Sequence, residues 1–450
     1  MNLSDILHRF DEQNIQRVKL GVFDIDGVLR GKYISRKKFE SAVLGGLGFC
    51  DVIFGWDIAD VLYEGVPVTI TGWKTGYPDA VARIDLETFR KVPWEPGTAL
   101  FLLDLHDKHG EPLPMAPRNV LRRVLKRAAD QGYDVWLAAE YEFFIFDETP
   151  DTLREKGYRN LRSLTPGMFG YSVVRASANA PLVLDLFDQL GAYGIAVEGL
   201  HTETGPGVYE AAIGVDKGLA AADKAALFKT AVKEICSRHG VIPTFMAKWN
   251  SELPGASGHV HQSLWDRAHD KNLFYGGESV MSTLMESYIA GLVKRLPELL
   301  PLFCPTINSY KRTVPGTWAP INATWGLDNR TTAIRAIPGG AKSTRIETRI
   351  CGADINPYLA MAASIAAGLE GVGEKMVLPP ATLNAYAAED AVPLPRNLAE
   401  ATDRFHRSEM ARAWLGDAFV DHYAATRQWE IRQSEKAVTD WELARYFEAI

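Results

Sequence analysis

The chain has 450 residues, of which 47% are hydrophobic and 23% are charged, a balance typical of a globular protein that excludes a largely disordered chain. This length predicts two or more domains and a core that needs no cross-links. The net charge of −7, from 49 basic and 56 acidic residues, argues against nucleic acid or an anionic membrane surface as the main partner. A small ligand that carries phosphate is still compatible with it, because a local cluster of basic residues can override the total charge.

Targeting signals and cross-links are not expected either. The first twenty residues are amphipathic and carry Asp and Glu, unlike a signal peptide, and no run of about 18 apolar residues predicts a membrane span. The four cysteines (Cys50, Cys236, Cys304 and Cys351) are far apart and form no C-x-x-C motif, which excludes a zinc ribbon and a thioredoxin-like site. We therefore expect a cytoplasmic protein with free thiols.

The first hundred residues predict a small domain rich in strands. Apolar residues alternate with polar or small ones over 18–22, and the pair Asp26-Gly27 that follows is typical of a tight hairpin turn. Residues 68–70 and 99–103 predict further short strands. We place the end of this domain near residue 110, just before a proline-rich stretch.

The second part of the chain mixes helices and strands. Residues 119–129 carry apolar side chains at helical spacing. Strands and helices alternate up to about residue 375, and helical periodicity dominates the remainder.

Two segments resemble phosphate-handling motifs without completing them. Residues 23–29 read F-D-I-D-G-V-L and match the nucleophile motif of haloacid-dehalogenase phosphatases, but the downstream Lys and distal acid pair of that chemistry are not recognisable. The favoured alternative is a β-hairpin with an Asp-Gly turn. Residues 339–344 approximate a P-loop, but Ala341 interrupts the required order.

The strongest local signal is the segment 139–146, whose aromatic content predicts a strand. Side chains alternate along a strand, so Glu140 and Glu142 would share one face. Two adjacent carboxylates repel each other and lose solvation, and a divalent cation is the simplest compensation. The alternative is a strand whose polar face meets water.

Further groups of charged residues follow the same kind of pattern. Glu203 and Glu210 flank a tight loop, and His259 and His261 alternate in a short strand. Arg345, Glu347 and Arg349 alternate in another short strand, and Arg312, Arg330 and Arg335 lie upstream of it. Each pattern alone also fits a solvent-exposed strand or loop. Together they form an oxygen-rich ligand set with one or two histidines and no sulfur, which favours Mg²⁺ or Mn²⁺ over zinc. Several arginines beside such a site indicate phosphate, so the combined pattern predicts phosphoryl transfer.

In order and spacing these segments resemble the glutamine synthetase family over nearly the whole chain. The matching stretches are E-Y-E-F-F from Glu140, the loop from His201 to Glu210, G-H-V-H-Q-S from Gly258, N-S-Y-K-R from Asn308, N-R-T-T-A-I-R from Asn329 and R-I-E-T-R from Arg345. The resemblance implies an α+β fold with a small N-terminal β-grasp domain (1–110) and a large catalytic domain (111–450). The catalytic domain would contain an antiparallel, curved, barrel-like sheet flanked by helices. The resemblance also implies a homo-oligomer of two stacked hexameric rings with sites between subunits.

Carried over by motif, the resemblance implies two metal ions, Mg²⁺ or Mn²⁺, with ATP and glutamate as substrates. The first ion would be bound by Glu142, Glu203 and Glu210, and the second by Glu140, His259 and Glu347. ATP would be bound by His261, Ser263, Arg330 and Arg345, and glutamate by Gly255, Arg312 and Arg349. The catalytic arginines would be Arg312, Arg330 and Arg349.

The chain departs from ammonia-using members on the amino-donor side. Trp318 stands where they carry a flap glutamate, and Phe54-Gly55-Trp56-Asp57 replaces an F-D-G-S-S loop with its Asp. Tryptophan offers a flat apolar wall or a cation–π face instead of an acid. We therefore predict a γ-glutamylamide synthetase that accepts an organic amine bulkier than ammonia, with specificity set by Trp318, Trp56 and Asp57. The alternatives are a true glutamine synthetase and a catalytically inactive structural or regulatory homologue.

Overall fold

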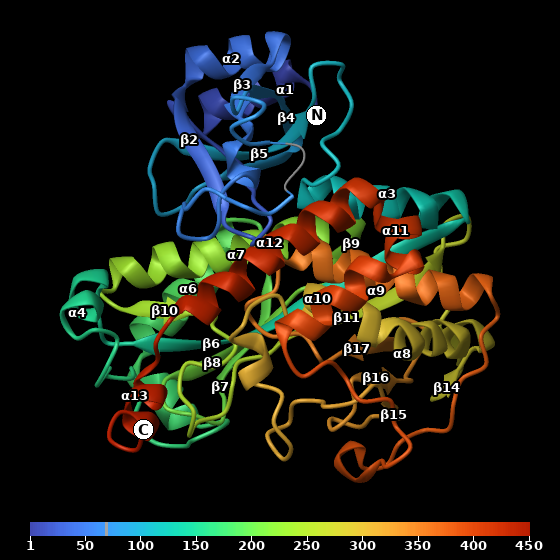
Figure 1. Ribbon diagram of the computed structural model, residues 1–450. Helices are drawn as coiled ribbons and strands as arrows, with labels where there is room; N and C mark the ends of the chain where they lie inside the picture. Colours follow the sequence, from blue (N-terminus) through green and yellow to red (C-terminus); the bar gives the residue numbers. More distant parts are fainter. Residues whose placement is uncertain (68–70) are drawn as a thin grey trace.

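The computed structural model describes residues 1–67 and 71–450, so the strand predicted for 68–70 lies outside the described residues. The chain folds into a mixed α+β structure with a smaller sheet near the N-terminus and a larger, curved sheet in the remainder (Figure 1). The strands β13 (Tyr275–Gly277) and β14 (Val280–Met281) form a separate two-stranded ribbon.

The smaller sheet has five strands in the order β2-β1-β5-β4-β3. The central strands β1 and β5 are parallel, and all other neighbours in this sheet are antiparallel. Its elements are α1 (Leu3–Glu12), β1 (Arg17–Phe23), β2 (Leu29–Ser35), α2 (Arg36–Gly45), β3 (Leu47–Cys50), η1 (Asp51–Phe54), β4 (Asp79–Lys91) and β5 (Thr98–His106). The strand predicted for 99–103 is confirmed within β5, whereas the β-grasp assignment of this domain stays a prediction.

The predicted hairpin joins β1 to β2 and uses both of its aspartates. The Asp24 carboxylate accepts hydrogen bonds from the backbone amides of Asp26 and Val28, at 3.0 and 2.9 Å, and from the Arg30 guanidinium at 2.8 Å. The Asp26 carboxylate accepts one from Arg427 in the C-terminal part of the chain. The hairpin interpretation is confirmed, and both carboxylates serve structural contacts rather than a phosphatase site.

The larger sheet follows the order β15-β16-β17-β11-β6-β8-β7, with three short strands at its sides. Its strands are β6 (Tyr133–Phe146), β7 (Val197–Thr202), β8 (Val208–Ile213), β9 (Asp216–Lys217), β10 (Ile242–Thr244), β11 (Gly258–Asp266), β12 (Lys271–Asn272), β15 (Trp325–Leu327), β16 (Ile334–Ile337) and β17 (Arg345–Thr348). The predicted antiparallel arrangement is wrong at one edge, where β15 and β16 are parallel. The loop between them doubles back, so that the amide of Ile334 bonds the carbonyl of Thr324 beside the start of β15.

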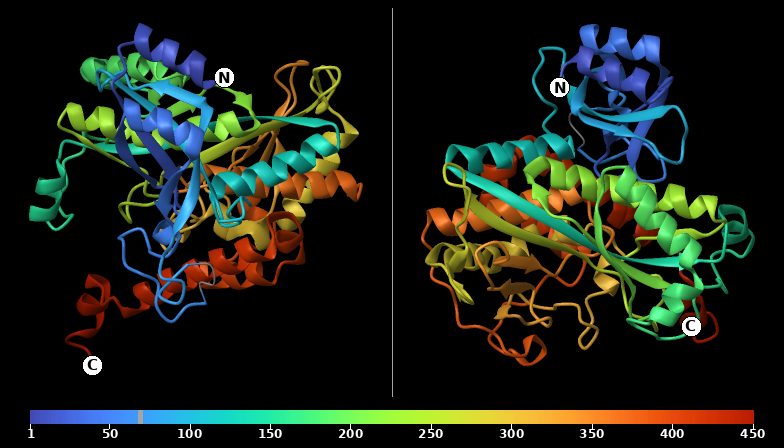
Figure 2. Two further views of the ribbon diagram at one scale, coloured as in Figure 1. Left: turned by 90° about the horizontal axis from the view of Figure 1, so that it is seen from above. Right: turned by 180° about the vertical axis from the view of Figure 1, so that it is seen from behind.

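Helices cover the face of the larger sheet that is turned toward the N-terminal domain (Figures 1 and 2). The helices of this part are α3 (Pro117–Asp130), α4 (Pro150–Glu155), α5 (Val173–Ala178), α6 (Ala180–Ala192), α7 (Gly218–Arg238), α8 (Thr283–Phe303), α9 (Pro357–Gly373), α10 (Leu398–Arg407), α11 (Glu409–Leu415), α12 (Asp417–Lys436) and α13 (Asp440–Tyr446), with the short η2 (Ser309–Lys311) and η3 (Ala385–Ala387). The helix predicted for 119–129 is confirmed as α3. Tyr141 of β6 stacks on Phe228 of α7, with the ring centroids 5.9 Å apart, so this face of the sheet is packed against helices.

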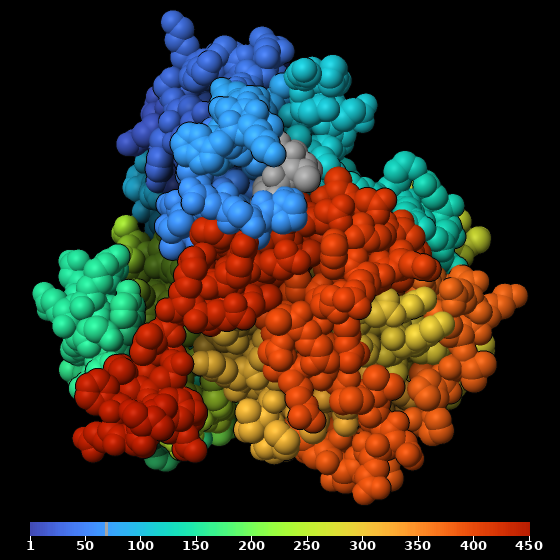
Figure 3. Space-filling model, in the orientation of Figure 1, coloured from blue at the N-terminus to red at the C-terminus, as the bar shows by residue number. Residues whose placement is uncertain are grey.

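The C-terminal part of the chain, red in Figure 3, runs across the front of the molecule beneath the N-terminal domain. In the described residues, no helix is both long and apolar enough to cross a membrane. All four cysteines are free thiols, as predicted.

The buried apolar side chains form two clusters. The smaller one lies in the N-terminal domain, between Ile6 and Ala116. The larger one fills the remainder of the chain and also takes in Phe23 and Leu100 of the N-terminal sheet and Ile25 of its hairpin turn. The two parts therefore share packing, and the boundary at residue 110 stays a prediction.

His422 on α12 is expected to make the stability of this fold sensitive to acid. Its ring is fully buried, neither nitrogen forms a hydrogen bond to the described residues, and burial lowers its pKa to about 4 from 6.5. The neutral imidazole therefore contributes its full stability above about pH 6.5. As pH falls from 6.5 to 4 this contribution is lost, and the free energy of unfolding decreases by about 3 kcal/mol, at 1.36 kcal/mol per pKa unit.

In urea unfolding at these two pH values, His422→Phe should remove most of this loss. The exposed His8→Gln variant should keep it, and an unchanged pH slope in His422→Phe would contradict the assignment.

Candidate active site

Four neighbouring strands of the larger sheet carry most of the predicted ligands. In the register of the sheet Glu140 lies opposite His259, Glu142 opposite Glu210, and His261 opposite Glu347. Strands β6, β8, β11 and β17 thus place residues that are far apart in the sequence on one face.

The alternation predicted for β6 is confirmed. Tyr141 and Phe143 are fully buried against the helical layer, whereas Glu140 and Glu142 are only partly buried on the other face. The two carboxylates therefore share a face, as the period of a strand requires.

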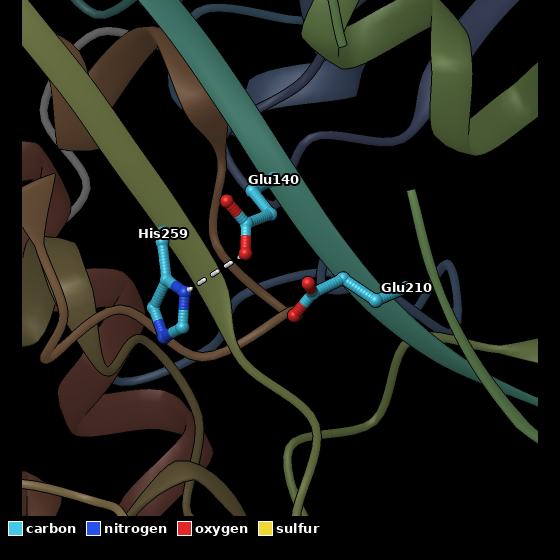
Figure 4. Close-up of side chains that lie close together, drawn as sticks. All are labelled: Glu140, Glu210 and His259. Atoms are coloured by element: carbon cyan, nitrogen blue, oxygen red, sulfur yellow. Dashed lines mark ion pairs between the residues drawn. The ribbon is translucent and has the colours of Figure 1, made fainter. Parts of the chain in front are cut away.

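Glu140, Glu210 and His259 converge from three strands on one point (Figure 4). Each offers a ligand atom, and these atoms lie within 4.8 Å of one another. His259 Nδ1 is 3.8 Å from a Glu140 oxygen and 3.2 Å from a Glu347 oxygen. Two or three carboxylates with one imidazole form a donor set that fits a divalent cation.

A second cluster contains His201, Glu203 and Glu210, again with ligand atoms within 4.8 Å of one another. His201 Nε2 lies 3.2 Å from Glu203 Oε1 and 3.4 Å from Glu210 Oε1. The ring of Tyr171 stacks on His201 at 4.3 Å between centroids. His201 is not among the predicted ligands, although its position two residues before Glu203 was a usable signal.

The two clusters cut across the predicted metal-ligand sets, which stay a prediction. Glu210 belongs to both clusters and bridges the two sets that the sequence keeps apart. Glu142 lies opposite Glu210 in the sheet, and one of its oxygens accepts the Ser257 amide at 2.7 Å. Pairing across the sheet, rather than order along the chain, decides which acids become neighbours.

The electrostatics of the clusters favour a bound cation. Burial and the neighbouring Glu140 carboxylate raise the pKa of Glu210 to about 11. Burial also opposes ionisation of Glu347, but the adjacent His259 and Arg349 outweigh it and lower its pKa to about 2. Since buried like charges repel one another, a divalent ion would stabilise all these carboxylates in their ionised form.

Arginines surround the acidic cluster. Glu347 accepts hydrogen bonds from both Arg335, at 2.9 Å, and Arg349. Arg335 also bonds Asp328, a contact that the sequence did not predict. Arg345 Nε lies 3.3 Å from His261 Nδ1, so its guanidinium lies beside a second residue that is predicted to bind ATP.

Arg312 lies deeper than the other predicted arginines. Its guanidinium is buried and donates to the carbonyl oxygens of Ile350 and Arg349, at 3.0 and 3.2 Å. Gly255 packs directly against it, because an added Cβ would lie 2.7 Å from Arg312 Cγ and 2.4 Å from the Ala247 oxygen. Only glycine fits there, which allows the backbone at 255 to approach the arginine.

A cavity of about 570 Å³ opens beside Glu140. It is lined by the predicted residues His261, Ser263 and Arg345, and by residues that the sequence did not single out, including Trp136, Trp265 and Lys342. This size and lining suit a small ligand with an apolar ring and charged groups. Arg330 does not line this cavity, and its carbonyl accepts a hydrogen bond from Arg349.

The flap, defined here as residues 312–320, holds Trp318 in an unusual conformation. The Trp318 side chain is 64% exposed, and its φ is +60°. A bulky side chain in the left-handed region costs of order 1–3 kcal/mol and persists only where its surroundings impose it. Within the flap, the Thr317 hydroxyl bonds the Val314 oxygen at 2.7 Å.

Trp56 and Asp57 lie in the N-terminal domain, and Asp57 also contacts helix α12. The Asp57 carboxylate accepts the indole N–H of Trp429 at 2.8 Å and the amides of Ala59 and Val61. The Arg30 guanidinium lies over the Trp56 ring, 5.3 Å from its centroid. Among the described hydrogen bonds, ion pairs and ring contacts, none joins either residue to Trp318 of the same chain.

Comparisons with known proteins agree with this architecture. Residues 114–446 match the family model "Glutamine synthetase, catalytic domain". The chain is 48% identical to a type-1 glutamine synthetase 2 of Dictyostelium discoideum, over 100% of this chain and 87% of that protein. It is 40% identical to a glutamate–isopropylamine ligase of Pseudomonas sp, over 98% and 96%.

A solved structure described as a GmaS/ADP complex superposes with a TM-score of 0.86 at 28% identity, covering 99% of both chains. The family model spans the acidic clusters, the arginines and the flap, and the relatives extend the match to the N-terminal domain. The chain therefore belongs to the glutamine synthetase family and is a carbon–nitrogen ligase.

Proposed function

We propose that this ligase uses ATP to join the γ-carboxylate of glutamate to an organic amine bulkier than ammonia, forming a γ-glutamylamide. The observation that carries the proposal is the convergence of Glu140, Glu210 and His259 beside an arginine-lined cavity, with a tryptophan in the flap. The relative that is named for its isopropylamine substrate supports an organic amine, and the type-1 glutamine synthetase supports ammonia as the second candidate.

The proposed metal-ligand sets are those that the family resemblance implies, and each contains two members of one acidic cluster. One divalent ion, Mg²⁺ or Mn²⁺, would be bound by Glu142, Glu203 and Glu210 and the other by Glu140, His259 and Glu347, with His201 added as a neighbour of the first. Bound ions would neutralise the charge that develops on the phosphates during transfer. His261, Ser263, Arg330 and Arg345 would bind ATP, and Gly255, Arg312 and Arg349 would bind glutamate.

The chemistry has two steps. A γ-carboxylate oxygen of glutamate attacks the terminal phosphorus of ATP, forming γ-glutamyl phosphate and releasing ADP. The arginines beside the clusters, Arg345 and Arg349 among them, would stabilise the transferring phosphoryl group. The amine nitrogen then attacks the acyl carbon, phosphate leaves with the C–O bond electrons, and the amine loses a proton. Exclusion of water protects the acyl phosphate from hydrolysis.

The amine side of the site is assigned chiefly to Trp318. Its aromatic ring replaces an acid and offers apolar contact rather than charge. Trp56 and Asp57 would take part only from a neighbouring copy, since each is engaged by other residues of its own chain. We accordingly place the enzyme in the cytoplasm as a homo-oligomer of two stacked hexameric rings.

The test is phosphate release dependent on ATP and glutamate, measured with ammonia and a panel of organic amines. At least one organic amine should have a kcat/KM about tenfold above that of ammonia, which corresponds to about 1.4 kcal/mol. Each product should be identified by mass as the γ-glutamylamide. Ammonia as the best acceptor by a wide margin would favour glutamine synthesis, and no glutamate-dependent phosphate would favour an inactive homologue.

A further inference from the structure

A segment that follows α9 forms hydrogen bonds to the region of the flap. We call residues 378–394 the strap. The Asn322 side chain, just beyond the flap, donates to the Ala385 carbonyl at 2.7 Å, and the Ala323 amide donates to the Val392 carbonyl at 2.8 Å. The chain that leaves the flap is thus held by both backbone and side-chain bonds.

The strap also holds the loop that carries Arg330. The Asn329 side chain donates to the carbonyls of Thr382 and Leu383, at 2.8 and 2.9 Å. The Ala385 amide donates to the Thr331 hydroxyl at 3.2 Å. One segment therefore contacts both the phosphate-side loop and the amine-side flap.

Tyr386 connects the strap to the flap itself. Its hydroxyl donates to the carbonyl of Ala319 at 3.3 Å. Burial raises the pKa of this phenol, while the positive charges of Arg349 and Arg312 oppose the rise. The half-buried hydroxyl is therefore a neutral donor in the field of the two arginines assigned to glutamate.

The hydrogen bond from Tyr386 lies next to the strained residue of the flap. Ala319 directly follows Trp318, whose left-handed backbone is maintained only if its surroundings fix it. The described bonds within the flap stop at Thr317, and the Tyr386 bond begins two residues later. Its loss would let the strained residue relax and carry its indole ring to a new position.

We propose that Tyr386 is a positioning residue that holds the flap closed over the acyl phosphate. This inference rests on the proposed γ-glutamylamide synthesis. With the flap loosened, water would attack the acyl carbon in place of the amine, giving glutamate and phosphate again. Each such event consumes one ATP and forms no amide, because the oxygen of water, rather than the nitrogen of the amine, bonds to the acyl carbon as phosphate leaves.

The experiment measures phosphate and amide in the same reactions of the full-length protein, with ATP, glutamate and the best amine of the panel. Wild type should release about one phosphate per amide. In Tyr386→Phe the ratio should rise at least about threefold, and the KM for the amine should rise while the KM for ATP stays within about twofold. A merely structural defect would lower all rates together and leave the ratio at one.

The matched control is Tyr423→Phe. Tyr423 also donates a phenolic hydrogen bond to a backbone carbonyl, that of Pro301 at 2.6 Å, but on helix α12 outside the flap and strap. This variant should keep the ratio near one even where it lowers thermal stability. A ratio near one in folded Tyr386→Phe would overturn the inference alone, whereas wild type without glutamate-dependent phosphate would overturn the proposed function.

Discussion

Replacing Glu210 by Gln is expected to lower kcat by about a hundredfold to a thousandfold, the scale found when one preorganised electrostatic group is removed from an active site. Glu210 is the one carboxylate common to both acidic clusters among the described residues, so its loss weakens both at once. Glutamine keeps the shape of the side chain but removes its charge. The same variant should therefore lose most of its affinity for Mn²⁺.

The thermal stability of metal-free Glu210→Gln should increase, although its activity falls. Burial and Glu140 raise the pKa of Glu210 to about 11, which means that its ionised form opposes folding when no cation is present. The cost grows as pH rises above the ordinary value of 4.5 toward 11. In the presence of a chelator at pH 8, Glu210→Gln should thus melt at a higher temperature than wild type, and added Mn²⁺ should stabilise only wild type.

Thermal unfolding with and without Mn²⁺, together with steady-state rates, separates these effects. Glu155→Gln, at an exposed position on α4, is the control and should resemble wild type in both assays. A Glu210→Gln variant that binds Mn²⁺ normally and keeps its rate would show that the clusters are structural.

Local patterns in the sequence predicted the elements of this site well. The alternation in β6 correctly placed Glu140 and Glu142 on one face, and the Asp26-Gly27 pair correctly predicted a hairpin. Both depend on physics within a few residues, namely the period of a strand and the geometry of a tight turn.

Contacts between distant strands could not be obtained in this way. The register that sets Glu142 opposite Glu210 joins segments about seventy residues apart, and a shift of one residue would turn every side chain to the other face. The shared use of Glu210, the addition of His201 and the Arg335–Glu347 pair likewise depend on registers between separate strands. The parallel pairing of β15 with β16 depends on a loop conformation that no periodicity encodes.

Trp318→Glu is expected to raise kcat/KM for ammonia relative to the best organic amine by about tenfold, or about 1.4 kcal/mol. A carboxylate attracts the small ammonium ion and helps to remove its proton, whereas the indole ring offers apolar contact to a larger amine. The backbone at 318 should tolerate the change, because glutamate and tryptophan share the same restriction at a φ of +60°.

The control for this prediction is Trp318→Gln, which removes the ring without adding charge. It should lose activity toward the organic amine and gain none toward ammonia, so that only the glutamate variant reverses the preference. Equal ammonia rates in the two variants would place amine selection elsewhere, with Trp56 and Asp57 of a neighbouring copy as the next candidates.

A large apolar side chain that is 64% exposed and held in a strained backbone, like that of Trp318, lacks a stabilising role within its own chain. Contact with a substrate or with a second subunit would supply one, and the amine preference of these two variants separates the two cases, because only substrate contact makes specificity follow the charge at residue 318.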